Sequence, residues 1–174
     1  MNFPQPCAKG TYGAATKLTQ ASGCRSCDAG FYCSETGADA PTAMCDSGYY
    51  CTGGATTPRP TTTAEGGSVC PAGAYCETGS ANPKYCQGGY YNPDTGKKTI
   101  YDCTLCPPGQ YCEGASSSTT SGNCADGYYC GSGSPVSTQN PAQPGTISNT
   151  DTEWKAESSC LQGYYNNKWA QSSC

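Results

Sequence analysis

The sequence predicts a small disulfide-rich protein: an elongated tandem array of short irregular β modules, with almost no helix and no conventional hydrophobic core. Two counts lead to this prediction. The 174 residues include 16 Cys, a density typical of a disulfide scaffold. Leu, Ile, Val, Met, Phe and Trp together number only 13, whereas a chain of this length with an ordinary core is about half apolar. Gly and Pro interrupt nearly every window, which disfavours helices.

A heptapeptide motif, Cys-x-x-Gly-x-Tyr-Cys, supplies the third observation, because it recurs eight times. Five complete copies begin at Cys27, Cys45, Cys70, Cys106 and Cys124, and three copies without the final Cys begin at Cys7, Cys86 and Cys160. Gly at the fourth place suits a left-handed turn conformation. On the short strand that follows, the fifth and sixth residues face opposite sides. We therefore expect the Tyr at the sixth place to pack inward against a disulfide; a Tyr ladder that binds carbohydrate or cross-links chains is the alternative.

A longer period divides the chain into parts. Six cysteines between Cys7 and Cys51 have counterparts 79 residues later, between Cys86 and Cys130. The predicted parts are a first repeat (7–51), a Thr/Pro-rich linker that contains an extra motif at 70–76 (52–85), a second repeat (86–130), a Ser/Thr/Pro-rich linker (131–159) and the start of a third repeat (160–174). Cys174 looks like the first cysteine of another Cys-x-x-Cys pair, which favours a longer array over a terminal capping repeat.

The motifs CPAGAYCETGS and CPPGQYCEG resemble the GCC2/GCC3, ephrin-receptor-like repeats of protist surface proteins, and the order of the six cysteines resembles tumour-necrosis-factor-receptor repeats. Cysteine spacing alone leaves the connectivity open. The receptor resemblance implies that cysteines pair one–two, three–five and four–six. On this chain it implies the bridges Cys7–Cys24, Cys27–Cys45, Cys33–Cys51, Cys86–Cys103, Cys106–Cys124 and Cys112–Cys130, which leaves Cys70–Cys76 and Cys160–Cys174.

The cysteine content also indicates the compartment and excludes several kinds of chemistry. Sixteen paired cysteines require an oxidising environment, so we expect an extracellular or cell-surface location. A zinc protein is the competing interpretation, but the chain has no His and only two Cys-x-x-Cys pairs. Without His, common catalytic triads are excluded, and we expect no enzyme activity, metal or cofactor. The net charge of −4 argues against nucleic-acid binding, and no apolar run is long enough for a membrane span.

Thr and Ser clusters beside Pro are typical of O-glycan acceptors in a secreted chain. An unmodified flexible linker is the alternative interpretation of these segments. The candidate acceptor residues are Thr56, Thr57, Thr61, Thr62, Thr63, Ser116, Ser117, Ser118, Thr119 and Thr120.

Outward aromatic side chains lead to a functional expectation. The fifth place of the motif carries Phe31, Tyr49, Tyr90, Tyr128 and Tyr164, and the chain has two tryptophans, Trp154 and Trp169. Aromatic residues carry much interface energy, although the tryptophans could instead serve as local staples. We expect an extracellular structural protein, a subunit of a glycosylated surface filament or appendage, with copies of itself and covalent O-glycans as partners. The alternative, implied by the receptor resemblance, is a ligand-binding ectodomain of a cell-surface receptor.

Overall fold

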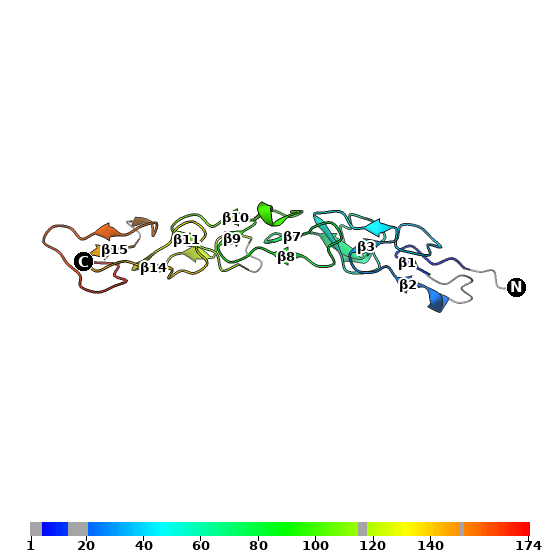
Figure 1. The fold of residues 1–174 in the computed structure, drawn as a ribbon, viewed down its shortest axis with the longest axis horizontal. Coiled ribbons are helices and arrows are strands. Elements are labelled where there is room, and N and C mark those ends of the chain that lie inside the picture. Colours follow the sequence, from blue (N-terminus) through cyan, green and yellow to red (C-terminus); the bar gives the residue numbers. More distant parts are fainter. Residues whose placement is uncertain (1–4, 14–20, 115–117, 150–151) are drawn as a thin grey trace. The chain divides into compact units, whose positions relative to one another are not determined.

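The structure is a computed structural model that describes residues 5–13, 21–114, 118–149 and 152–174. Its regular structure consists of small antiparallel hairpins joined by turns (Figure 1). The described residues contain no α-helix, and the 3-10 helices that lie wholly within them are single turns: η1 (Ala21–Gly23), η2 (Thr63–Glu65) and η3 (Ile100–Asp102). The prediction of a disulfide-rich array of short β modules with almost no helix is confirmed.

Each hairpin pairs two short strands across a loop. The pairs are β1 (Thr11–Tyr12) with β2 (Arg25–Ser26), β3 (Phe31–Tyr32) with β4 (Ala43–Met44), β5 (Tyr49–Cys51) with β6 (Gly67–Val69), β7 (Ala74–Tyr75) with β8 (Lys84–Tyr85), β9 (Tyr90–Tyr91) with β10 (Thr104–Leu105), β11 (Gln110–Tyr111) with β12 (Gly122–Asn123), β13 (Tyr128–Tyr129) with β14 (Asn140–Pro141), and β15 (Thr146–Ile147) with β16 (Ser158–Ser159). The chain forms two compact units, Met1–Lys84 with Asp94–Asp102, and Tyr85–Pro93 with Cys103–Cys174.

The heptapeptide forms the turn that starts each hairpin. In the first copy, the Thr11 N–H donates to the Ala8 carbonyl over 3.0 Å, and Gly10 between them has a φ of 78°. This is a type II turn, which needs a residue with positive φ at its third position. The same turn begins each of the eight hairpins, and it also occurs at 160–166, where the described residues form no further strand. We therefore define nine turn modules: modules 1–4 in the first unit are 7–13, 27–33, 45–51 and 70–76, and modules 5–9 in the second are 86–92, 106–112, 124–130, 142–148 and 160–166.

Module 8 lacks both cysteines, and the sequence interpretation missed it. It reads Ala-Gln-Pro-Gly-Thr-Ile-Ser, with Ala142 and Ser148 where the other modules have Cys. Both of these residues are fully buried, and Gly145 has a φ of 85°. The segment 131–159, interpreted from the sequence as a linker without periodicity, therefore contains a complete module and three strands.

All sixteen cysteines are paired, as predicted, but the expected connectivity is half wrong. The bridges Cys7–Cys24, Cys70–Cys76, Cys86–Cys103 and Cys160–Cys174 are confirmed. The expected bridges Cys27–Cys45, Cys33–Cys51, Cys106–Cys124 and Cys112–Cys130 are wrong; these cysteines pair as Cys27–Cys33, Cys45–Cys51, Cys106–Cys112 and Cys124–Cys130.

The turn itself explains the correction. It places the first and seventh Cα atoms of each complete module 5.8–6.4 Å apart, a separation that a disulfide can span. Modules 1, 5 and 9 have no Cys at the seventh place, and their first Cys pairs with one 14 or 17 residues further on. Closing a loop as short as that of the complete modules stabilises by about 2 kcal/mol in the chain-entropy account.

Module 8 provides a test of this fold. In the double variant Ala142→Cys with Ser148→Cys, the new thiols should form a ninth disulfide, because the turn holds these positions as in the complete modules. Mass spectrometry of the non-reduced protein should show the loss of two further hydrogens, and the bridge should raise the free energy of unfolding by about 2 kcal/mol. Free thiols at these positions, or exchange with neighbouring bridges, would contradict the assignment of module 8.

Candidate functional site: the face between successive modules

Two backbone hydrogen bonds join each module to the next one in its unit. The Gly30 N–H of module 2 donates to the Cys51 carbonyl at the seventh place of module 3 over 2.8 Å, and the Cys45 N–H at the first place of module 3 donates to the Gly30 carbonyl over 2.9 Å. Both bonds recur, at 2.7–3.1 Å, at the fourth-place glycines Gly10, Gly48, Gly89, Gly109, Gly127 and Gly145. The fourth-place peptide is therefore both donor and acceptor for the stacking of modules.

The same glycines also admit a loop from two modules further along. A Cβ atom on Gly30 would lie 2.4 Å from the carbonyl oxygen of Gly79, in the loop after module 4. Corresponding distances of 2.1–2.6 Å apply at Gly10, Gly48, Gly89, Gly109 and Gly127. No side chain can occupy these positions, because the contact is with backbone. This close approach, together with positive φ, accounts for Gly at the fourth place of modules 1–3 and 5–7. At Gly145 and Gly163 a Cβ would meet nothing within 4 Å, and positive φ alone favours Gly.

Tyr at the sixth place packs against the disulfide of the following module in the first unit. Tyr12 forms a cluster with Cys27 and Cys33. In the same way, Tyr32 packs on the cluster of Cys45, Cys51 and Ala55, and Tyr50 packs on the cluster of Cys70, Ala74 and Cys76. The prediction that the sixth-place Tyr packs inward against a disulfide is confirmed for these three residues. The disulfide that each Tyr contacts belongs to the next module, not to its own. These clusters are the core of the unit.

Tyr12 shows how a buried phenol is satisfied. Its hydroxyl donates to Asp28 Oδ2 over 2.9 Å, and the guanidinium carbon of Arg25 lies 5.6 Å from the ring centroid. The hydrogen bond to Asp28, and secondly the cost of desolvating a phenolate, raise the pKa of Tyr12 above its usual value. Tyr12 therefore stays neutral well above neutral pH and keeps donating to Asp28.

The predicted interface residues differ in exposure. Phe31, Tyr49 and Tyr128 are only half-buried, because each stands opposite a neighbouring-strand residue, Met44, Val69 and Pro141 respectively. Tyr90, opposite Leu105, is 38% exposed. Trp154 is half-buried, and its indole N–H donates to Asp126 Oδ1 over 3.0 Å. Packing against the neighbouring strand thus accounts for much of the burial of the fifth-place aromatic side chains, without a partner molecule.

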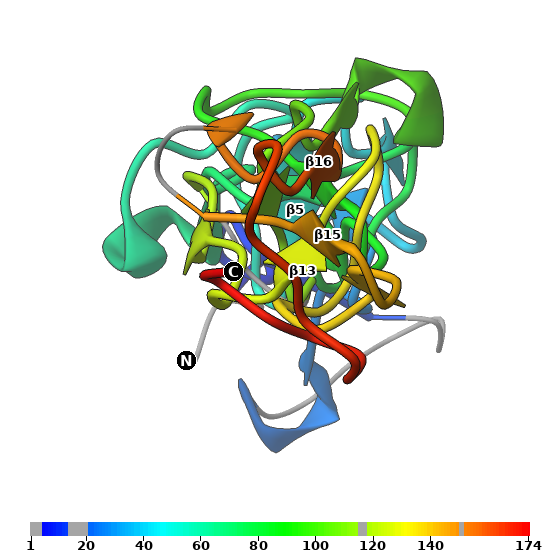
Figure 2. The same cartoon turned by 90° about the vertical axis from the view of Figure 1, so that its left-hand side faces the viewer.

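Module 9 presents the most exposed apolar group of the second unit. Leu161 is 77% exposed, Tyr164 66%, Tyr165 81% and Trp169 58%. A Cβ on Gly163 would meet nothing within 4 Å. The C-terminal segment lies beside β15 (Figure 2), where the Ser148 N–H donates to the Gln171 carbonyl, and it does not cover these side chains.

The expected O-glycan acceptors lie on loops of unequal exposure. Thr61, Thr62 and Thr63 are exposed, whereas Thr56 and Thr57 are half-buried. Ser118 and Thr119 are exposed and Thr120 is half-buried, while Ser116 and Ser117 lie outside the described residues. The exposed trio has a fixed backbone, since the Thr61 N–H donates to Glu65 Oε2 over 2.6 Å, and this bond lowers the pKa of Glu65.

The described residues show neither a metal-ligand cluster nor a membrane-spanning helix, and the chain matches no known family. In the described part of the chain, no three His, Cys, Asp or Glu side chains are grouped as metal ligands. No helix among those residues is both long and apolar enough to cross a membrane. No protein-family model matches the chain, and no curated protein matches it.

The sequence interpretation missed the role of the fourth-place glycine in stacking. It assigned the glycine to a turn only, which explains positive φ but not the contact with a loop two modules away. The sequence does contain a signal for this contact, because a second glycine recurs three or four residues after the seventh place. It is found at Gly37, Gly54, Gly79, Gly96 and Gly133, each with positive φ.

A matched pair of substitutions tests the Tyr–disulfide contact. Tyr50→Ala removes a ring that packs on the bridge of module 4, and should lower the free energy of unfolding by about 2 kcal/mol. Tyr165→Ala removes an exposed ring and should change it by less than about 0.5 kcal/mol. Guanidinium unfolding under non-reducing conditions, followed by near-ultraviolet circular dichroism, measures both. Equal effects of the two substitutions would argue against the stacked core.

Proposed function

We propose that this protein is an extracellular structural subunit whose copies join end to end into a glycosylated surface filament or appendage. The observation that carries the proposal is the module interface, which occurs seven times within the two units with the same pair of hydrogen bonds. An interface that repeats in this way needs no new chemistry to continue between two molecules. Head-to-tail contacts that do not close into a ring generate filaments.

Modules 1 and 9 offer complementary groups. On module 9, the described residues include no partner for the Gly163 N–H or carbonyl, and Tyr165 is exposed. On module 1, the described residues include no stacking partner for the Cys7 N–H or the Gly13 carbonyl, whereas the corresponding groups of modules 2 and 3 have one. These are the donors and acceptors that each internal interface uses. Module 1 of a second copy would therefore continue the array after module 9.

The internal interfaces also specify the register of this contact. The Gly163 N–H would donate to the Gly13 carbonyl of the second copy, and the Cys7 N–H of that copy would donate to the Gly163 carbonyl. Tyr165 would pack on its Cys7–Cys24 bridge. The loop two modules further along would bring the Gly37 carbonyl of the second copy against Gly163, as Gly79 lies against Gly30.

Two other features support an extracellular structural role. Eight disulfides are consistent with an oxidising compartment. The exposed Thr61, Thr62 and Thr63 would carry O-glycans away from the stacking faces, where they would limit lateral association. The half-buried Phe31, Tyr49 and Tyr128 make a lateral contact at every module less favourable than the end-to-end contact at module 9.

Gly163→Ala tests the proposed contact. A Cβ at this position meets nothing within 4 Å in the isolated chain, so the variant should fold with a cost of about 1 kcal/mol from the positive φ. In the assembled protein the Cβ would collide with the incoming carbonyl. Self-association, measured by light scattering after size-exclusion chromatography and by electron microscopy, should weaken at least tenfold.

Gly131→Ala is the matched control, because this glycine also has open space around it and has no positive φ. It should assemble like the parent protein. Gly163→Ala fibres indistinguishable from those of the parent would exclude the proposed contact. A native protein that stays monomeric at micromolar concentration and binds a separate protein would instead favour a receptor ectodomain.

A further inference from the structure

One pocket of the second unit lies where the loop after module 8 meets module 6. It has a volume of about 290 Å³ and lies over the turn of module 6. Its lining comes from the turn and strand of module 6, from Asn123 before module 7, and from the loop after module 8: Pro107, Pro108, Gly109, Gln110, Asn123, Glu153, Trp154 and Lys155. The pocket is open to solvent and therefore accessible to a ligand.

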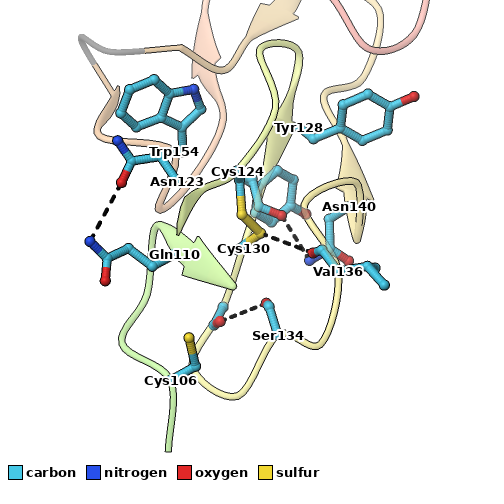
Figure 3. The surroundings of a disulfide bond; sticks show 12 residues. Cys106, Gln110, Asn123, Cys124, Tyr128, Cys130, Ser134, Val136, Asn140 and Trp154 are labelled. Carbon is cyan, nitrogen blue, oxygen red and sulfur yellow. Dashed lines mark hydrogen bonds between the residues drawn. A yellow bond between two sulfur atoms is a disulfide. The ribbon is translucent and has the colours of Figure 1, made fainter. Parts of the chain in front are cut away.

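Module 6 differs from the modules with an aromatic fifth place at the residues that line this pocket; modules 1 and 8 have small hydroxyl pairs there, Thr11 with Ser26 and Thr146 with Ser159. Where Phe31, Tyr49, Tyr90 and Tyr128 stand opposite an apolar residue, module 6 has Gln110 opposite Asn123. The Gln110 Nε2 donates to Asn123 Oδ1 at a long 3.5 Å (Figure 3). The Gln110 Oε1 and the Asn123 Nδ2 have no hydrogen bond among the described residues. Module 6 thus carries two amides at this place, and they retain an acceptor and a donor.

The loop after module 8 departs from the pattern in a second, independent way. Glu153 and Trp154 have φ values of 49° and 52°, in a conformation that glycine adopts in most of the other loops. The backbone keeps the role of the glycine loop, since the Glu153 carbonyl lies against Gly109 and the Trp154 carbonyl accepts from the Cys130 N–H. Non-glycine residues in this strained conformation concentrate at functional sites. Here the strain places an indole and two charged side chains beside the amide pair.

The indole is held in place rather than free to rotate. Its N–H donates to Asp126 Oδ1 over 3.0 Å, on the neighbouring module 7. Lys155 Nζ forms an ion pair with Glu153 Oε2. The hydrogen bond from Lys155 lowers the pKa of Glu153, so the Glu153 carboxylate is charged at neutral pH. The pocket therefore combines one fixed aromatic surface with balanced charge and two neutral amides.

We propose that this pocket binds a single pyranose ring of a saccharide. A pyranose has a face of C–H groups that would lie on the indole, and hydroxyls that both donate and accept, as the Gln110 and Asn123 amides require. The pocket volume is just below the range of about 300–1,000 Å³ that holds drug-sized ligands, which suits one ring. The balanced Glu153–Lys155 pair disfavours a strongly anionic or cationic ligand.

Tryptophan fluorescence can test the proposal, because the chain has only two tryptophans. In the variant Trp169→Phe, the emission comes from Trp154 alone. Methyl glycosides of glucose, galactose, mannose and N-acetylglucosamine are titrated, with glycerol as the control for a non-specific polyol effect. At least one glycoside should change the emission in a saturable way, with a dissociation constant of about 1 mM, as expected for one small ring with few polar contacts.

The matched control is a double substitution that copies the apolar pair of module 2 into module 6, and we call it the template variant. Gln110→Phe with Asn123→Met, in the Trp169→Phe background, reproduces the pair Phe31–Met44 found 79 residues earlier. It should keep the unfolding midpoint of its parent and weaken saccharide binding at least tenfold. The proposal is overturned if no glycoside acts differently from glycerol, or if the template variant binds as tightly as its parent.

A further experiment distinguishes two sources of the saccharide, the O-glycans of the protein itself and a foreign molecule. The titration is repeated on protein from a eukaryotic secretory host before and after enzymatic removal of O-glycans. A response that emerges only after their removal assigns the pocket to the O-glycans of the protein itself. The same response in both samples assigns it to a foreign saccharide.

Discussion

The peptide groups of the fourth-place glycines are the constraint on which the rest of the structure depends. Positive φ at Gly30 turns its N–H and its carbonyl toward the next module, where both are satisfied within 2.9 Å. A chain with few apolar side chains cannot bury backbone polar groups without such partners. Because the absence of a Cβ also admits the Gly79 carbonyl, one residue type serves the turn, the neighbouring module and the module after that.

Disulfides and hydrogen bonds have separate tasks in this arrangement. A bridge such as Cys45–Cys51 joins residues only six apart, so it constrains its own turn and links no distant segments. Stacking is carried by the glycine peptides and by rings such as Tyr32, which lies on that bridge. Module 8 separates the two effects: it has no bridge between Ala142 and Ser148, yet it keeps both stacking hydrogen bonds on each side. Stability should therefore be the sum of local and nearest-neighbour terms, as in other repeat arrays.

The motif allowed the array, the turn at Gly10 and the inward Tyr12 to be predicted from the sequence, because these depend on local geometry. The pairing of Cys27 with Cys33 was missed since the expectation came from a resemblance, although a turn of this kind brings its own ends together. Module 8 was missed because its cysteines were lost together, which left only Gly145 and the preceding Pro144 as signals. The pocket at Trp154 could not be predicted, because its lining combines module 6 with Asn123 and with the loop after module 8, and stacking brings these segments together.

Backbone stacking also explains how such an array can vary its surface. The residues that hold modules together are glycines, the sixth-place Tyr and the half-cystines, so the fifth place and the loops are free to change. Gln110 and Asn123 replace an apolar pair without altering the strand register, which matches that of Phe31 and Met44. Glu153 stands where an equivalent loop has Gly133, and Trp154 stands where that loop has Ser134, while both carbonyls keep the corresponding contacts. A recognition site can therefore be built on one module while the faces that join modules, including that of module 9, stay unchanged.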